Sequence, residues 1–272
     1  MSAVKIRLDR VSVEYNHNHK RHRSRLRFWK RKQDCSEAQS KVVLHDISLE
    51  IKAGEFVCFL GHSGCGKSTL LETIAGFRKP ARGAVWVDDV KVEGPQADHV
   101  FVFQEGALFP WLTIVDNVAV ALRSIKDPAE RLNRAKYYLE LVALEGICTY
   151  YPHMLSGGMR QRAEIARALA AEPDILLMDE PFTGLDYLTR LHLREEMVNL
   201  HLVLPQTTIL FVTHDIDEAL QLSDRLIMLT DPPASVKCCH EIGVLHPRAL
   251  TCPALSELRS RIFHHLGVHT AI

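Results

Sequence analysis

The first segments of the chain alternate apolar and polar residues. Residues 4–13 (VKIRLDRVSV) and 42–51 (VVLHDISLEI) both follow this pattern of period two. Because successive side chains of a strand point to opposite faces, the alternation predicts two strands that each have one buried and one solvated face. We expect these strands to pair in an antiparallel sheet.

Later apolar runs are continuous rather than alternating. Four of them read EFVCFL, DILLMDEP, TTILFVTHD and DRLIMLT, at residues 55–60, 174–181, 207–215 and 224–230. Short runs separated by helical patterns, such as residues 188–203, are typical of parallel strands that are buried on both faces. The pattern predicts an α/β core, to which the segments GAVWVDD and HVFVFQ add further strands.

The pattern turns helical between residues 113 and 171, beginning with TIVDNVAVALRS and PAERLNRAKYYLELVAL. We expect a helical subdomain, at about residues 105–160, inserted into the α/β core. The main domain would span residues 1–230. Beyond it, prolines and the segments KCC and HPRAL predict an irregular tail, residues 231–272, that ends in a short helix.

Composition changes this picture little. The chain has 272 residues, 47% of them hydrophobic, which suits a packed core, and its 33 Lys and Arg balance its 33 Asp and Glu. Seven cysteines without a C-x-x-C pair favour a reducing compartment and give no disulfide or zinc pattern. No run of eighteen apolar residues occurs, so we do not expect the chain to cross a membrane.

One local exception is a basic insert at residues 16–41, within the N-terminal β region. Eight Lys and Arg fall between Lys20 and Lys32, together with a Leu, a Phe and a Trp. This composition favours contact with anionic lipid through residues 17–33 over contact with nucleic acid, and we expect no specific nucleic-acid partner. A solvated, disordered loop is the equally simple alternative. Three histidines in this segment have no apparent second set of metal ligands.

The segment GHSGCGKS, residues 61–68, matches the phosphate-binding pattern G-x-x-x-x-G-K-[ST], with a predicted strand before it and a helix after it. Its glycines let successive amides point inward, and its lysine reaches the outer phosphates of a nucleotide. An ordinary glycine turn is the alternative. The predicted nucleotide-binding residues are Gly61, His62, Ser63, Gly64, Cys65, Gly66, Lys67, Ser68 and Thr69.

Two carboxylates end the apolar run ILLMDEP. After a matched phosphate loop, we expect Asp179 to bind Mg²⁺ together with the hydroxyl of Ser68. Glu180 can polarise an attacking water as a general base, a contribution of roughly 10²–10⁴ in rate. The predicted cofactors are therefore ATP and Mg²⁺.

A second set of bare amides occurs in LSGGM, which precedes a predicted helix. The chain thus resembles the ATP-binding cassette (ABC) family, whose signature sequence looks like this segment, with Met where Gln is more usual. The resemblance implies a head-to-tail pair in which the signature of one copy closes over the ATP of the other. A simple helix N-cap is the alternative for these residues alone. The signature residues are Leu155, Ser156, Gly157, Gly158 and Met159.

Other residues fall in the family's order. The resemblance implies that Gln104 contacts the magnesium and takes part in catalysis, that His214 is the switch histidine for the γ phosphate, and that Asp186 lies at the dimer interface. It also implies that Tyr15 stacks on adenine, although the insert begins one residue later and a surface tyrosine is an alternative. The predicted fold is a P-loop NTPase with a RecA-like core, an N-terminal antiparallel β subdomain and an inserted α-helical subdomain.

Within that family, FQEGALFPWLTIVDNVAVAL and MDEPFTGLD look similar to ATPase subunits of nitrate, taurine and aliphatic sulfonate importers. The resemblance implies hydrolysis of ATP coupled to uptake of a small anion, at the cytoplasmic face of the inner membrane. The implied partners are a second ATPase copy, transmembrane permease subunits and, indirectly, a periplasmic or extracellular solute-binding protein. The cluster Phe109, Pro110 and Trp111 would receive a permease helix, or else pack inside the helical subdomain.

Two other classes of protein are alternatives to a transport ATPase. A soluble, non-transport cassette protein typically has two cassettes or a long coiled-coil insert, and neither occurs here. A GTPase or a small-molecule kinase would leave the LSGGM segment unexplained, and no N-K-x-D guanine motif is present.

Overall fold

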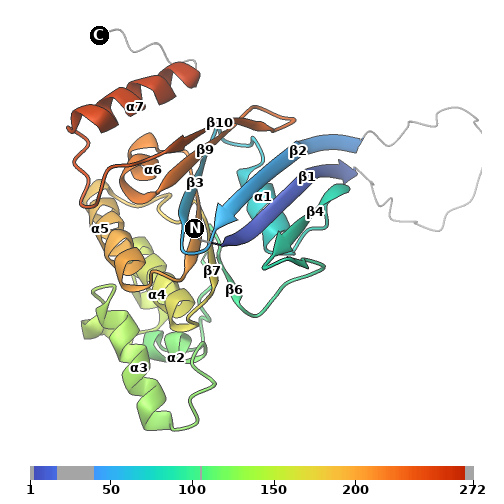
Figure 1. Ribbon diagram of the computed structural model, residues 1–272. Coiled ribbons are helices and arrows are strands. Elements are labelled where there is room, and N and C mark those ends of the chain that lie inside the picture. Colours follow the sequence, from blue (N-terminus) through green and yellow to red (C-terminus); the bar gives the residue numbers. More distant parts are fainter. Residues whose placement is uncertain (1–2, 17–39, 105, 267–272) are drawn as a thin grey trace, which may run out of the picture.

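The computed structural model describes residues 3–16, 40–104 and 106–266, and they build two sheets with helices around them (Figure 1). The smaller sheet is antiparallel and has the strand order β2-β1-β4-β5. Its strands are β1 (Val4–Asn16), β2 (Ser40–Lys52), β4 (Arg82–Val87) and β5 (Val90–Lys91). The predicted antiparallel pairing of residues 4–13 with 42–51 is confirmed. Residues 17–39, which hold nearly all of the basic insert, lie outside the described residues.

The larger sheet has six strands in the order β10-β9-β3-β8-β7-β6. Strands β9, β3, β8, β7 and β6 are parallel neighbours, as the continuous apolar runs predicted, and β10 is antiparallel to β9. The bounds are β3 (Phe56–Leu60), β6 (His99–Val102), β7 (Ile175–Asp179), β8 (Thr208–Thr213), β9 (Arg225–Leu229) and β10 (Val236–Glu241).

Two hydrophobic cores lie on opposite faces of the larger sheet. In β3, Phe56 and Cys58 face a core shared with most of the helices, whereas Val57 and Phe59 face a core shared with the smaller sheet. Helix α1 (Lys67–Ile74) lies between the two sheets (Figure 1). Its residues Leu70, Leu71 and Ile74 belong to the core that the larger sheet shares with β1 and β2. Burial on both faces explains why these strands contain almost no polar residues.

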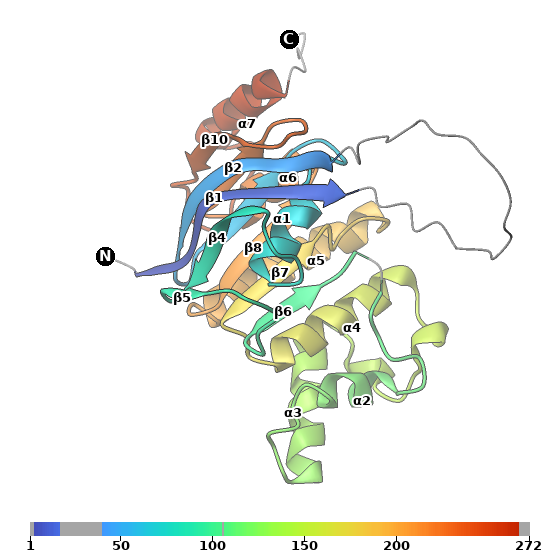
Figure 2. The same cartoon turned by 90° about the vertical axis from the view of Figure 1, so that its right-hand side faces the viewer.

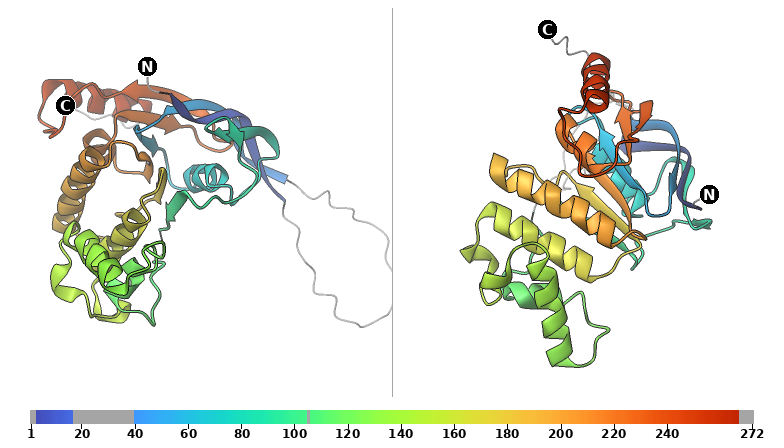
Figure 3. Two further views of the ribbon diagram at one scale, coloured as in Figure 1. Left: turned by 60° about the horizontal axis from the view of Figure 1, so that its bottom comes forward. Right: turned by 60° about the vertical axis from the view of Figure 1, so that its left-hand side comes forward.

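The helical subdomain follows β6 and stands apart from the smaller sheet (Figure 2). It contains α2 (Ile114–Ala119), α3 (Pro128–Glu140), two 3₁₀ turns (Glu145–Ile147 and Pro152–Met154) and the start of α4 (Gly157–Ala170). Helices α5 (Tyr187–Val203) and α6 (Ile216–Leu222) cover the larger sheet, and α7 (Pro253–His265) lies above β10 (Figures 1 and 3). No helix among residues 3–16, 40–104 and 106–266 is long and apolar enough to span a bilayer.

The prediction of an irregular segment directly after Asp231 was wrong. Residues 236–241 form β10, whose polar sequence VKCCHE alternates between half-buried and exposed positions because only one face meets the core. Hydrogen bonds from Arg248 also hold the tail in place. Its buried guanidinium donates to the carbonyl oxygens of Leu220, Ser223, Ile242 and Val244. The predicted terminal helix is confirmed as α7.

Candidate nucleotide-binding and hydrolysis site

The phosphate-loop residues connect the end of β3 to the start of α1. Gly64 and Gly66 have φ angles of +77° and +111°, which side chains other than glycine rarely adopt. A Cβ on Gly66 would also lie 2.9 Å from Leu44 Cδ2. The glycines are therefore needed for the turn itself, which brings the loop back onto the N-terminus of α1. A helix N-terminus with free amides is a suitable site for phosphate.

Lys67 is the first residue of α1 and is only 4% exposed. Its ammonium donates to the carbonyl oxygens of Gly61 at 2.9 Å and of His62 at 3.0 Å, and it lies 3.6 Å from Glu180 Oε1. A buried ammonium that is held by the loop and faces a carboxylate is a strong partner for an anion that enters the loop.

The next residue, Ser68, donates its hydroxyl to Asp179 Oδ1 at 2.9 Å. Asp179 ends β7, so two oxygen ligands of the type that Mg²⁺ prefers meet beside the loop. Burial raises the pKa of Asp179, and the hydrogen bond from Ser68 and the charge of Lys67 oppose this effect. A divalent cation would relieve the cost of that burial, so these residues fit Mg²⁺.

Glu180 lies at the centre of a small polar cluster. Its backbone has φ +45°, an uncommon value for a residue with a side chain, and its amide donates to the Val212 carbonyl at 3.0 Å. Glu180 Oε2 accepts from Thr183 Oγ1 at 3.1 Å and lies 3.1 Å from Nδ1 of His214. His214 is 56% exposed, so one end of this cluster is open to solvent.

Tyr15 and Gln104 differ in how firmly the structure holds them. The hydroxyl of Tyr15 lies 3.2 Å from Oγ1 of Thr69, and the guanidinium of Arg78 covers its ring at 4.4 Å. The ring is therefore beside the loop, but one of its faces is taken. Gln104 is exposed after β6, and within the described part of the chain no hydrogen bond joins it to Ser68 or Asp179.

The signature segment lies at the start of α4. Ser156 caps the helix by accepting from the Met159 amide at 3.3 Å, and Ser156 and Gly157 are exposed. Leu155 is buried and anchors the segment. Asp186 similarly caps α5 by accepting from the amide of Thr189 at 3.1 Å. The hydrogen bond from the Thr189 hydroxyl, together with that from the amide, lowers the pKa of Asp186.

The signature and the residues after Glu180 touch each other. A Cβ on Gly158 would lie 2.7 Å from Thr189 Cγ2, so α4 and α5 approach closely at their N-terminal ends. The exposed caps of the two helices therefore form one surface. Within the described residues, no hydrogen bond or ion pair links this surface to Lys67 or Ser68 of the same chain.

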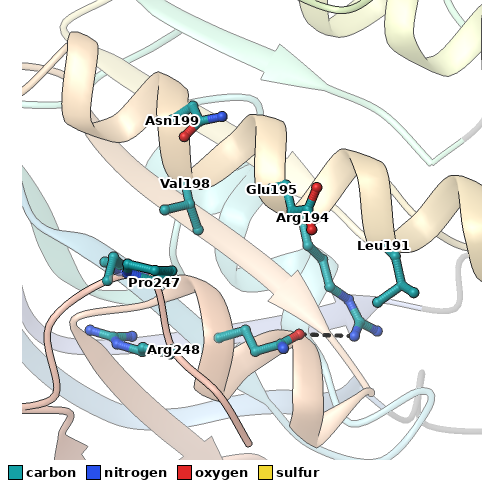
Figure 4. A pocket seen from close by; sticks show the side chains of 9 residues that line it. Leu191, Arg194, Glu195, Val198, Asn199, Pro247 and Arg248 are labelled. Carbon is teal, nitrogen blue, oxygen red and sulfur yellow. Dashed lines mark hydrogen bonds between the residues drawn. The ribbon is translucent and has the colours of Figure 1, made fainter.

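A separate pocket of about 190 Å³ between α5 and the segment after β10 contains two arginines (Figure 4). Both are already engaged: Arg194 donates to Gln221 Oε1 at 3.1 Å, and Arg248 donates to backbone carbonyls. A phosphate would have to compete with these bonds, so this pocket does not rival the loop as a nucleotide site.

Several contacts were not evident from the sequence. Thr183 holds Glu180 and Arg78 covers Tyr15. No sequence motif marks Thr183 or Arg78. Two thiols, Cys238 and Cys239, are neighbours in β10, and of these two only Cys239 is exposed. Cys238 is half-buried and lies 3.5 Å from His240 Nε2. Cys238 and His240 are two residues apart, and within a strand this spacing places both side chains on one face. That spacing was the signal in the sequence.

Known proteins resemble this chain over most of its length. Residues 44–183 match the family model described as ABC transporter. The chain is 40% identical to an aliphatic sulfonates import ATP-binding protein of Bacillus anthracis, over 89% of this chain and 94% of that protein. It is 43% identical to a nitrate import ATP-binding protein of Synechococcus elongatus, over 71% and 72% of the two chains.

Solved structures match as well. A dimeric bacterial ABC transporter cassette superposes with a TM-score of 0.73 at 31% identity, and a dimeric post-hydrolysis cassette bound to ADP and Pi gives 0.71 at 31% identity. Each match covers 88% of this chain and all of the other. The RecA-like P-loop fold with its two subdomains is thereby confirmed, and the chain belongs to the ABC transporter family as an ATP-hydrolysing cassette.

Proposed function

We propose that this chain is the ATP-hydrolysing subunit of an importer for a small anion such as nitrate, taurine or an alkanesulfonate. The observation that carries the proposal is the meeting of Lys67, Glu180 and His214 at one edge of the larger sheet, next to the pair Ser68 and Asp179. Residues 61–69 would hold the nucleotide. Ser68, Asp179 and, after a local movement, Gln104 would hold Mg²⁺.

The chain's own residues suggest a division of labour in hydrolysis. Mg²⁺ held by these residues would supply positive charge at the phosphate oxygens. Glu180 orients a water and accepts its proton, because Thr183 and His214 fix one carboxylate oxygen while the other stays close to Lys67. His214 is exposed enough to reach the γ phosphate from the solvent side.

The other half of the site would come from a second copy of the chain. Two observations support this: Ser156 and Gly157 of the signature are exposed, and both solved cassettes are dimers. In a head-to-tail pair, Leu155 to Met159 of one copy cover the ATP of the other, with Asp186 at the interface. Two bound ATP molecules would then hold the pair closed until hydrolysis releases it.

A groove beside β6 suits a permease helix. It encloses about 400 Å³ and is lined by Phe101, Phe109 and Arg167, among others, and Trp111 next to it is 70% exposed. The guanidinium of Arg167 lies 5.3 Å from the centre of the Phe109 ring, which gives the groove a polar rim beside an apolar floor. The chain would thus sit on the cytoplasmic face of the membrane, with the solute-binding protein contacting only the permease.

Solute identity is proposed from the relatives, whose printed names specify sulfonates and nitrate. The lipid contact through residues 17–33 remains a proposal that rests on composition.

The test is the substitution Glu180→Gln in the full chain, with Glu140→Gln, an exposed residue of α3, as the matched control. We expect kcat for ATP hydrolysis to fall by about 10²–10⁴ in Glu180→Gln, with ATP retained in a stable dimer that gel filtration can detect. The control should keep native turnover. Native hydrolysis by Glu180→Gln would contradict the assignment of the base.

A further inference from the structure

The tail brings together three metal-ligating side chains that the proposed function does not use. Cys238 and His240 lie two residues apart on β10, and His265 is the last residue of α7. One ligand atom from each of the three residues lies within 4.8 Å of the others. We propose that these residues form a binding site for a single zinc ion, which links the end of α7 to the edge strand of the larger sheet.

The spacing of the ligand atoms matches a tetrahedral ion. Cys238 Sγ lies 3.5 Å from His240 Nε2 and 3.6 Å from His265 Nδ1. At ordinary zinc–sulfur and zinc–nitrogen bond lengths, tetrahedral angles place a thiolate sulfur and an imidazole nitrogen about 3.6 Å apart. Two edges of the tetrahedron are therefore already set. The two imidazole rings are stacked, with centroids 5.7 Å apart, so both present an edge toward the sulfur.

The backbone explains why the three side chains meet. The alternation of β10 turns Cys238 and His240 to its half-buried face, whereas Cys239 and Glu241 are exposed. Helix α7 is anchored by its buried residue Ile262, and the ammonium of Lys237 donates to the carbonyl of His265. The end of α7 is thereby held over β10, a tight arrangement that a zinc ion would reinforce.

The pKa shifts of two of the ligands affect zinc binding in opposite directions. Burial, together with the charges of His265 and Arg261, lowers the pKa of His240 and so favours the neutral ring that a metal needs. Burial raises the pKa of Cys238, so zinc would displace the thiol proton on binding.

Of the three ligands, His265 lines a hollow of about 320 Å³, which Lys237 and Asp231 also line. All three ligands are only half-buried, so a water would complete the coordination. The same hollow is lined by His62 of the phosphate loop, whose Nδ1 lies 2.9 Å from Asp231 Oδ1. Because this hollow borders the phosphate loop, zinc binding must be measured without nucleotide. Metal bound with ATP at the Mg²⁺ site then does not contribute to the signal.

The experiment uses the full chain, stripped with a chelator under reducing conditions and titrated with Co²⁺ as a spectroscopic probe and with Zn²⁺. We expect one equivalent of Co²⁺ to produce a thiolate-to-metal charge-transfer band and tetrahedral visible bands, both displaced by Zn²⁺. Zinc should also raise Tm by several degrees, because it binds only the folded site. Cys238→Ser and His265→Ala should lose both signals.

Two cysteine variants serve as controls. Cys239→Ser changes the neighbouring thiol on the opposite face of β10, and Cys35→Ser changes the thiol of the basic insert, where histidines could hold metal independently. Both variants should keep the charge-transfer band. A band that survives in Cys238→Ser, or disappears in Cys35→Ser alone, overturns the proposal, as does a wild-type chain that shows no band at all.

Discussion

The phosphate loop and the signature segment both present backbone amides at the start of a helix, but the chain completes only one of them. At the loop, Lys67 is 4% exposed and is surrounded by two carbonyls and Glu180. At the signature, Ser156 and Gly157 are exposed, and Ser156 makes a single capping bond to Met159. The difference indicates that the first site is preformed, and it supports the proposal that a partner copy completes the second.

Helix capping explains only part of the signature. Ser156 does cap α4, so the simpler alternative from the sequence holds for that residue. Capping does not require two glycines, which weaken a helix by up to about 1 kcal/mol each. Gly158 has a packing reason, since a Cβ would lie 2.7 Å from Thr189 Cγ2, whereas a Cβ on Gly157 would meet nothing within 4 Å. Packing therefore does not explain why Gly157 is a glycine, and function is the explanation that remains.

The largest expected effect comes from mixing two inactive variants. Lys67→Ala disables the loop, and Ser156→Glu places a carboxylate where the partner's phosphate would lie; each homodimer should lose turnover by about 10²–10³. In a mixed head-to-tail dimer both lesions fall on one site and leave the other site intact. Equal mixing should restore about a quarter of all sites, measured as ATPase activity. Failure of the mixture to recover activity would mean that the signature acts within its own chain.

A smaller effect is expected on binding of ATP by a single copy. Loss of the Lys67 ammonium removes a charge-assisted interaction, which should weaken ATP binding by about 10–100-fold. Ser156→Glu should leave ATP affinity unchanged at chain concentrations below dimer formation, because the exposed end of α4 is not part of that half-site. Isothermal titration of both variants separates the two regions. Equal losses in both would erase the distinction between them.

The sequence predicted the loop better than the surface around it. Residues 61–69 lie where the glycine pattern placed them, because local backbone demands determine that turn. The continuous apolar runs likewise identified β3, β7, β8 and β9, since burial on both faces leaves a clear pattern. These features depend on neighbours in sequence, which is why periodicity and spacing were sufficient.

Contacts between distant segments could not be predicted in the same way. Arg78 covers the ring of Tyr15, and Glu180 is held by Thr183 and His214. The backbone conformation of Glu180 follows from no sequence rule. Strand β10 was missed because an edge strand that is buried on one face tolerates Lys and Glu on the other. These features follow from the packing of the whole fold rather than from local preference.

The stability of the loop itself should depend on Gly66. Gly66→Ala forces a side chain into φ +111° and places its Cβ 2.9 Å from Leu44, so the free energy of unfolding should fall by about 1–3 kcal/mol. Gly64→Ala is the matched control, since φ at Gly64 is also positive but a Cβ there would meet no atom within 4 Å. Urea denaturation without nucleotide measures both. A control that is destabilised more than Gly66→Ala would refute the steric account.

The smallest stability effect is expected at Gly157, and it sharpens the comparison most. A methyl group there meets no atom within 4 Å, and alanine favours a helix, so Gly157→Ala should keep or raise the free energy of unfolding by up to about 1 kcal/mol. If the segment were only a helix cap, turnover would be unaffected as well. If the partner's phosphate approaches this amide closely, turnover should fall in a chain that is at least as stable as the native one. Denaturation and ATPase assays on the same preparation therefore separate a structural glycine, such as Gly66, from one that is kept open for a second copy.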